Sequence, residues 1–312
     1  MISRRLLRIK CLKALYSHLQ TEENPISVAE KNMLFSITKS YDLYHLMLRL
    51  IVDVAEVVEN TMDQRATKLR PTFEDLNPNR RFVENPIIAH IRNSENLNTY
   101  LIKNNLGWET HPELVKKITT NMLDRAYYKT YMEKENVTFE DHKAFIVNFY
   151  KREIEDFDYI FEVLDEMSMF WVDEAEFITY NVIYLIKNIK EENLLKDISV
   201  PPLYKNKTDL KFVKELINET LLSYRDNEVY IDRFTKNWDY ERIALTDRIL
   251  MQLAITEFVR FKEIPVSVSM NEYIELSKFY STPQSSVFIN GILDKIASDL
   301  ETEGKLEGKV KK

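Results

Sequence analysis

The sequence predicts an all-α protein built from helical bundles, and three observations carry this prediction. Only 4 of the 312 residues are glycines, against about 22 at average usage, which leaves few positions for hairpin turns or phosphate-binding loops. Apolar residues recur at helical spacing along most of the chain, and no segment sustains the alternation of a strand. Rossmann, P-loop and β-sandwich domains are therefore disfavoured, and the 12% aromatic content argues against a disordered chain.

The helices can be placed in order along the chain. Apolar residues share one face over 4–20, and a loop at 21–27 leads to a long periodic stretch at 28–69. Residues 70–86 hold three prolines and are typical of a linker or a series of turns. Further helical patterns follow at 87–104, 112–134, 139–167 and 172–192.

A second break, DISVPPLYKNK at 197–207, precedes the last group of helices. The segment IPVSVSM at 264–270 comes nearest to a strand, but its proline turn runs into helical spacing, so we expect a loop and a helix start. The polar residues 302–312 are expected to fray. The last helical patterns lie near 208–225, 228–236, 239–261, 267–280 and 283–301.

A weak internal repeat relates Asp141–Trp171 to Asp209–Trp238. Each segment contains an acid, an apolar helix, a second short helix and a tryptophan, and each is followed by helical apolar residues. Two hypotheses stay open: a degenerate duplication of one helical unit, or the general likeness of amphipathic helices.

Charge is distributed unevenly. The net charge is −7, which argues against a protein that coats nucleic acid over its whole surface. Residues 1–21, by contrast, contain five basic side chains and no acid, a candidate phosphate-binding arm. The alternative is a solvated helix end. The basic residues are Arg4, Arg5, Arg8, Lys10 and Lys13.

The single cysteine, Cys11, permits no internal disulfide, and its apolar helix position favours the core over a nucleophile. No apolar run reaches the roughly 18 residues that a membrane helix needs. Lys13 and His18 interrupt any signal-peptide core. We therefore expect a cytoplasmic protein without membrane segments.

Motifs of catalysis and metal binding are missing from the sequence. HExxH, CxxC, GxSxG and GxGxxG do not occur. Asp42 and His45 have the i, i+3 spacing found in di-iron bundles, but no second acid–x–x–His accompanies them. We expect no metal, no cofactor and no enzymatic activity.

The segment Ser281–Ser285 has the composition of a helix start, with Thr282 as cap and Pro283 at the first position. Free amides and the serine hydroxyls there suit a phosphate or an RNA loop. Phe288 follows and could stack on an unpaired base. The alternative is a core role, because Phe288 begins an i, i+4 apolar stripe.

The last hundred residues resemble the NusB family of transcription antitermination factors. The resemblance rests on NWDYERIALTDRILMQLAITEF from Asn237 and on IPVSVSMNEYIELSKFYSTPQSSVFINGILDKIA, which ends at Ala297. The N-terminal RRLLRIKCLKALY is similar to the opening of the family pattern. The likeness covers about residues 3–20 and 208–300.

This resemblance implies an all-helical fold of two three-helix bundles that binds boxA-type RNA in ribosomal RNA leaders. The partners it implies are NusE, a small-subunit ribosomal protein, and an antitermination complex on RNA polymerase. The RNA-binding residues it implies are Arg4, Arg5, Arg8, Tyr16, Ser285 and Phe288. The NusE-binding residues it implies are Glu241, Asp247 and Arg248.

The chain also departs from the family pattern. Met251-Gln252 replaces the usual Arg, and Val287 stands where a basic or small polar residue is common. We expect a basic N-terminal helix at 1–24, a helical insertion or degenerate repeat at 25–205, a NusB-like region at 206–301 and a tail at 302–312.

Two other functions stay open. One is a non-catalytic scaffold in ribosome assembly, and the other is an accessory domain related to RNA methyltransferases. Gly291 lies within a predicted helix, where glycine costs about 1 kcal/mol relative to alanine. We therefore expect a close packing contact at Gly291.

Overall fold

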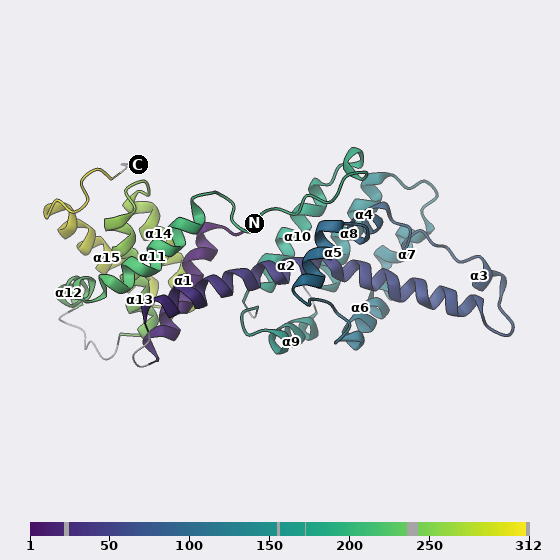
Figure 1. Ribbon diagram of the computed structural model, residues 1–312, viewed down its shortest axis with the longest axis horizontal. Coiled ribbons are helices and arrows are strands. Elements are labelled where there is room, and N and C mark those ends of the chain that lie inside the picture. The colour runs from purple at the N-terminus through teal and green to yellow at the C-terminus, as the bar shows by residue number, and fades with distance from the viewer. Residues whose placement is uncertain (22–24, 155–156, 172, 236–242, 310–312) are drawn as a thin grey trace. The chain divides into compact units, whose positions relative to one another are not determined.

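The computed structural model is all-α, which confirms the predicted fold class (Figure 1). The structure describes residues 1–21, 25–154, 157–171, 173–235 and 243–309. These residues form fifteen α-helices, one short 3-10 helix and no strand, apart from an isolated bridge between Ile2 and Tyr204. None of the helices in these ranges is long and apolar enough to cross a membrane.

The chain divides into two compact units. Unit 1 comprises Met1–Ile37 and Pro202–Lys312, and unit 2 comprises Thr38–Pro201. The first division falls within helix α2 (Ile26–Ala66), so the first turns of this helix belong to unit 1.

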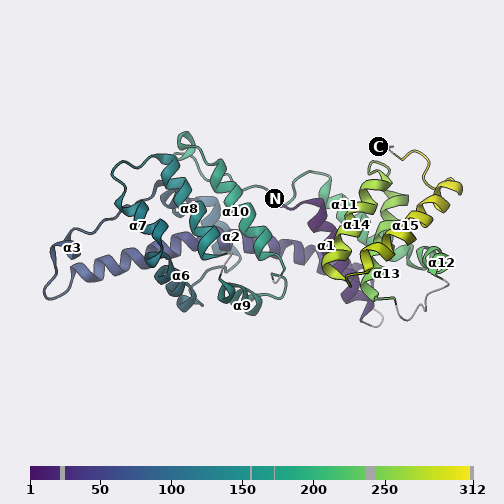
Figure 2. The same ribbon diagram turned by 180° about the vertical axis from the view of Figure 1, so that it is seen from behind.

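The helices of unit 1 pack around α13 and are visible from both sides in Figures 1 and 2. Helices α1 and α11 pack against each other and against α13, which also packs against α12, α14 and α15. The helices are α1 (Arg4–Leu19), the first turns of α2, α11 (Asp209–Leu222), α12 (Tyr224–Thr235), α13 (Leu245–Arg260), α14 (Val266–Tyr280) and α15 (Ser285–Thr302).

Helix α13 is the centre of unit 1. Every side chain from Ile249 to Phe258 is buried, because α1, α11, α12, α14 and α15 all pack on this helix. Three of these buried side chains are polar: Gln252, Thr256 and Glu257. A buried polar group needs a partner, so they require hydrogen bonds from the surrounding helices.

Unit 2 surrounds the remainder of α2. The Tyr150 hydroxyl donates to the Met47 carbonyl at 2.8 Å, and Trp108 Nε1 donates to the Leu46 carbonyl at 3.0 Å. Both aromatic side chains are buried. The other helices are α3 (Phe73–Leu76), α4 (Pro86–Arg92), α5 (Glu95–Lys103), α6 (Pro112–Asp124), α7 (Ala126–Glu133), α8 (Phe139–Glu153), α9 (Asp158–Met167), α10 (Ala175–Asn188) and η1 (Glu191–Asn193).

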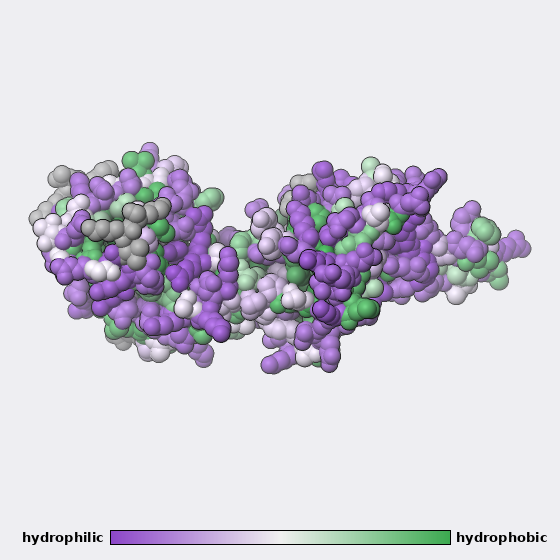
Figure 3. Space-filling view, turned by 90° about the horizontal axis from the view of Figure 1, so that it is seen from above, coloured by the Kyte–Doolittle hydropathy of each residue, from purple (hydrophilic) through white to green (hydrophobic). Residues whose placement is uncertain are grey.

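Several predicted helices are divided in the structure. The pattern at 87–104 forms α4 and α5, because the Ser94 hydroxyl accepts from the Leu97 amide and starts a new helix. The predicted linker at 70–86 contains α3, which begins with a capping box of Thr72 and Asp75. Figure 3 shows apolar residues at the end of unit 2 that carries α3, where Leu69, Phe73 and Leu76 are exposed.

The sequence predicts that the tail frays, but its residue Lys309 contacts the end of α13. Lys309 Nζ donates to the carbonyls of Glu257 and Phe258, each at 2.8 Å, and of Phe261 at 3.1 Å. The ammonium group therefore satisfies the last carbonyls of α13, a position that suits a cation.

Candidate nucleic-acid interface

The arginines of α1 make ion pairs within unit 1. Arg4 Nε donates to Asp209 Oδ1 at 3.2 Å, and the Arg4 guanidinium lies 4.8 Å from the centre of the Phe212 ring. Arg5 pairs with Glu272 through two hydrogen bonds of 2.9 and 2.7 Å. These side chains are 32% and 49% exposed, so each keeps a solvent-facing part.

Arg8 occupies a different environment, because its side chain is only 4% exposed. Its guanidinium donates to both oxygens of Glu257, at 2.9 and 2.6 Å. The hydroxyls of Ser269 and Tyr273 donate to the same carboxylate at 2.6 and 2.8 Å. Burial, followed by the charge of Glu257, raises the pKa of Tyr273. Arg8 therefore has a structural role in this geometry, and its burial leaves it little surface for a phosphate.

Acidic partners thus offset part of the positive charge of the N-terminal helix. Lys10 is also buried and donates to the Ser36 carbonyl at 2.8 Å. Glu257 and Glu272 lie in the segment that resembles the NusB family, but nothing in their spacing indicated arginine partners. Asp209 offered no signal beyond its position at a helix start.

Helix α1 lies beside α14 with matched spacing. Arg5 pairs with Glu272, and eight residues further along both helices Lys13 Nζ lies 5.8 Å from the centre of the Tyr280 ring. Eight residues span roughly 12 Å of helix. Tyr16 follows Lys13 by three residues, so it lies on the same side of α1, and it is 44% exposed. Lys13 and Tyr16 therefore lie toward the end of α14 that leads into α15.

The start of α15 differs from the prediction. The helix begins at Ser285 with no side-chain cap, and the Ser285 amide donates to the Thr282 carbonyl at 3.0 Å. Thr282 is therefore not the cap, and Pro283 is not the first helical residue. The Thr282 hydroxyl lies 2.8 Å from the Ser285 hydroxyl, which also donates to Asp247 Oδ2 at 2.8 Å. The Ser285 side chain is buried and holds this turn against α13.

A cavity of about 800 Å³, which we name the Asp247 cavity, opens beside this turn. The half-buried Phe288 and the exposed Val287 line it. Asp247 is 5% exposed, and among the described residues its Oδ1 has no hydrogen-bond partner. An unpaired buried acceptor costs about 1–3 kcal/mol. The lining residues are Ile243, Ala244, Asp247, Thr282, Pro283, Gln284, Ser285, Val287, Phe288, Gly291, Ile292 and Lys295.

Gly291 does not make the expected close contact. Apart from its chain neighbours and the backbone of its own helix, a Cβ atom at this position would meet no described atom within 4 Å, and the residue lines the Asp247 cavity. The missing side chain therefore leaves space in the cavity instead of allowing a close approach of two helices.

Of the residues implied for NusE binding, the structure describes Asp247 and Arg248, which differ in burial. Asp247 is buried. Arg248, half-buried on the first turn of α13, acts electrostatically on Tyr224 and Asp232 of α12. Burial is the main cause that raises the pKa of Asp232, and the Arg248 charge opposes it. Glu241 lies outside the described residues, as do the motif residues Asn237 and Trp238.

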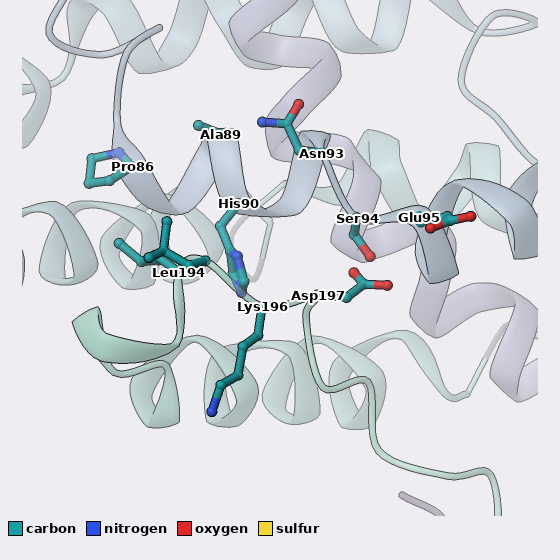
Figure 4. Close-up of a pocket in the computed structure, with 10 residues that line it drawn as sticks. Pro86, Ala89, His90, Asn93, Ser94, Glu95, Leu194, Lys196 and Asp197 are labelled. Atoms are coloured by element: carbon teal, nitrogen blue, oxygen red, sulfur yellow. The ribbon is translucent and has the colours of Figure 1, made fainter.

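Unit 2 contains a separate cavity of about 430 Å³ beside His90 (Figure 4). Burial is the main cause that lowers the pKa of His90, and a hydrogen bond with the Leu194 backbone opposes it. Asp197 Oδ2 accepts from the Asn96 amide at 2.9 Å, and Oδ1 accepts from the Ile198 amide at 2.7 Å. These contacts tie the loop after η1 to α5, and none of the predicted site residues lies here.

The Asp42–His45 pair is part of an aromatic cluster. His45 Nδ1 lies 2.8 Å from the Tyr41 carbonyl, and its ring stacks on Tyr100 with centroids 3.8 Å apart. Asp42 accepts from Lys39 and Tyr100, both at 2.7 Å. Among the described residues, no three His, Cys, Asp or Glu side chains form a group that could hold a metal.

Comparison with known proteins identifies the family. Residues 178–298 match the model of the NusB family. The chain is 40% identical to transcription antitermination protein NusB of Salinibacter ruber over 105 residues, which is 34% of this chain and 66% of the relative. It is 36% identical to the protein of that name from Natranaerobius thermophilus over 95 residues, 30% of this chain and 68% of the relative. The chain belongs to the NusB family.

The match to the family is partial along both chains. The protein named NusB in Chloroherpeton thalassium is 32% identical over 123 residues, 39% of this chain and 58% of the relative. The chain thus spans 58 to 68% of the length of these three relatives. No solved structure matches it. The family match includes α11 to α14 and most of α15, and it begins within α10 of unit 2.

Proposed function

We propose that this chain is an RNA-binding transcription antitermination factor that acts with NusE on boxA-type RNA of ribosomal RNA transcripts. It would join an antitermination complex on RNA polymerase, and its mechanism is binding without catalysis. The observation that carries the proposal is the NusB family match over 178–298, which includes the helices around the Asp247 cavity. The names of the relatives support the antitermination role.

In this proposal the RNA contacts Lys13, Tyr16 and Phe288 near the end of α14. A lysine and two aromatic side chains combine phosphate neutralisation with base stacking. The partly exposed Arg4 and Arg5 extend the contact along α1. Arg8 and Ser285 stabilise the site without contacting the RNA, because Arg8 donates hydrogen bonds to Glu257 and Ser285 donates one to Asp247.

NusE is proposed to bind beside the start of α13, where Arg248 is half-buried. Glu241 precedes this helix in the sequence and stays a candidate for the same contact. Asp247 is buried, so in this proposal it stabilises the start of α13 and makes no direct contact with NusE.

The test measures binding of a fluorescent boxA RNA to the full chain by anisotropy, at two salt concentrations, with and without NusE. We expect submicromolar binding that NusE strengthens and salt weakens, because basic groups displace counterions from phosphates. A Tyr16→Ala variant should bind less tightly. Tyr180→Ala is the matched control, since Tyr180 is 65% exposed and lies in unit 2. Equal binding of a scrambled RNA would rule out specific recognition.

The scaffold hypothesis predicts a different outcome. A Lys13→Ala/Arg5→Ala variant would then associate with RNA as the unchanged protein does. Arg8 is left intact in this test because its removal would leave Glu257 as an unpaired buried charge and destabilise the fold.

A further inference from the structure

We propose that the exposed end of unit 2, which we name the α3 tip (residues 65–76), is a second contact for single-stranded RNA. This inference rests on the proposed RNA-binding function and adds a site outside the part of the chain that matches the NusB family. Exposed arginines without acidic partners among the described residues, together with an exposed phenylalanine, are the observations that motivate it.

Three large apolar side chains of the α3 tip face solvent. Leu69 is 98% exposed, Phe73 77% and Leu76 57%. Figures 1 and 2 both show α3 at the end of α2, and Figure 3 shows hydrophilic residues around the apolar ones there. A single exposed leucine is ordinary, but three such side chains in one short segment indicate a binding surface.

The α3 tip is held in shape by its own hydrogen bonds. The Thr72 hydroxyl accepts from the Asp75 amide, and the Asp75 carboxylate accepts from the Thr72 amide, both at 3.1 Å. Lys68 Nζ lies 3.3 Å from the same carboxylate. Phe73 is therefore presented by a folded turn, which reduces the conformational entropy lost when a ligand binds.

The charges left over on the α3 tip are mostly positive. Arg65 and Arg70 are exposed, and neither has an acidic partner in the part of the chain that the structure describes. Lys68 and Asp75 pair with each other, so Glu74 is the acid that faces these two arginines. Guanidinium groups bind phosphates, and an exposed aromatic ring stacks on an unpaired base of any kind. The α3 tip thus combines the two elements of a site that holds single-stranded RNA without reading its sequence.

Two other occupants fit the α3 tip less well. Insertion into an anionic membrane would carry Glu74, the neighbour of Phe73, toward the hydrocarbon layer, where an ionised carboxylate is costly. A second copy of the chain would bury little more than three apolar side chains per partner, whereas a stable interface buries about 800 Å² on each side. RNA requires neither, because contacts to phosphates supply much of its affinity. A transcript already bound to unit 1 would also raise the effective concentration of its neighbouring nucleotides at a second site on the same chain.

The experiment compares a short boxA RNA with the same RNA extended by about thirty uridines, each titrated against the full chain by fluorescence anisotropy. We expect the extension to tighten binding about tenfold, because it adds a stacked base and phosphate contacts. Phe73→Ala should weaken binding of the extended RNA at least about fivefold, the low end for loss of one stacked base. Arg65→Gln/Arg70→Gln should reduce the salt slope by about 1.4, since each phosphate contact of a single strand contributes about 0.7. Neither variant should change binding of the short boxA RNA.

Matched controls remove the same kinds of side chain elsewhere in unit 2. Tyr180→Ala removes another exposed aromatic ring, and Lys151→Gln/Arg152→Gln removes two other exposed positive charges. Both controls should bind the two RNAs as the unchanged protein does. Thermal unfolding of each variant checks that it folds.

The outcomes separate this inference from the proposed function. If the short boxA RNA binds but the extension adds no affinity, or the variants of the α3 tip keep that added affinity, the inference is overturned and the proposed function stands. Binding of the α3 tip to vesicles of phosphatidylserine and phosphatidylcholine, without binding to the extension, would also overturn it. If boxA RNA does not bind but free oligouridine binds and requires Phe73, the proposed function is overturned and the α3 tip stays an RNA site.

Discussion

Two buried carboxylates on α13 illustrate opposite uses of a charge. Glu257 accepts from both guanidinium nitrogens of Arg8 and from the hydroxyls of Ser269 and Tyr273. Asp247, ten residues earlier on the same helix, accepts from Ser285 through Oδ2, and its Oδ1 has no partner in the described part of the chain. The hydrogen bonds to Glu257 join α1 and α14 to α13, whereas one buried oxygen of Asp247 has no partner among the described residues.

The largest effect is expected when the hydrogen-bonded site around Glu257 is disrupted. Arg8→Ala should lower the free energy of unfolding by about 3–5 kcal/mol, because it leaves Glu257 as an unpaired buried charge. Urea denaturation measures the change. Arg5→Ala is the control and should cost less than about 1 kcal/mol, since the Arg5–Glu272 pair is near the surface. A loss for Arg8→Ala no larger than the control would contradict the structural role of Arg8.

The next effect concerns the cavity. Phe288→Ala should weaken RNA binding by about 1–3 kcal/mol, the usual contribution of stacking one base on an aromatic ring. Anisotropy titrations with boxA RNA measure it. Leu222→Ala is a matched control, because Leu222 is 67% exposed and lies at the end of α11, outside the residues that line the cavity. If Phe288→Ala binds boxA RNA as tightly as the unchanged protein, Phe288 is not part of the RNA site.

A smaller effect tests the space beside Asp247. Gly291→Ala should stabilise the protein by about 1 kcal/mol, because alanine favours a helix interior more than glycine and the new Cβ meets no described atom of another helix within 4 Å. Thermal and urea unfolding give the sign. Destabilisation would show that Gly291 is tightly packed and that the space beside it is smaller than the structure indicates.

The smallest effect is a pH dependence beside the satisfied site. The hydrogen bond from Arg5 is the main cause that lowers the pKa of Glu272. A folded pKa below the unfolded value contributes stability above the unfolded pKa, near 4.3, and this contribution is lost as pH falls through the folded value. Arg5→Gln should flatten this part of the profile of unfolding free energy between pH 6 and pH 3, by less than about 1 kcal/mol. Identical profiles would show that the pair contributes nothing.

Much of the fold was predictable because helical periodicity is a local property. The scarcity of glycine, the periodic apolar residues and the buried position of Cys11 all agree with the structure. The helix ends were less predictable. Ser94 and Thr72 start helices through side-chain caps inside segments that the sequence predicts as one long helix and as a linker. The first half of the predicted repeat and the segment after it form three consecutive helices, α8, α9 and α10. The second half and the segment after it form three more, α11, α12 and α13. The duplication stays a hypothesis.

The candidate site was less predictable than the fold. A run of basic residues indicates phosphate binding only if the side chains reach solvent, and Arg8 and Lys10 do not. Gly291 was expected to serve packing, yet it leaves a cavity open. In both cases the outcome depends on residues more than two hundred positions away or on another helix, which no local pattern encodes.

By itself, the sequence determined that this protein is all-α and resembles the NusB family, because periodicity and spaced motifs are written along the chain. Only the tertiary structure decided which buried charges gain hydrogen-bond partners within the described residues. The partners of Arg8 and of Asp247 come from helices far apart in sequence. How fully a buried charge is hydrogen-bonded depends on how many donors those helices bring to it.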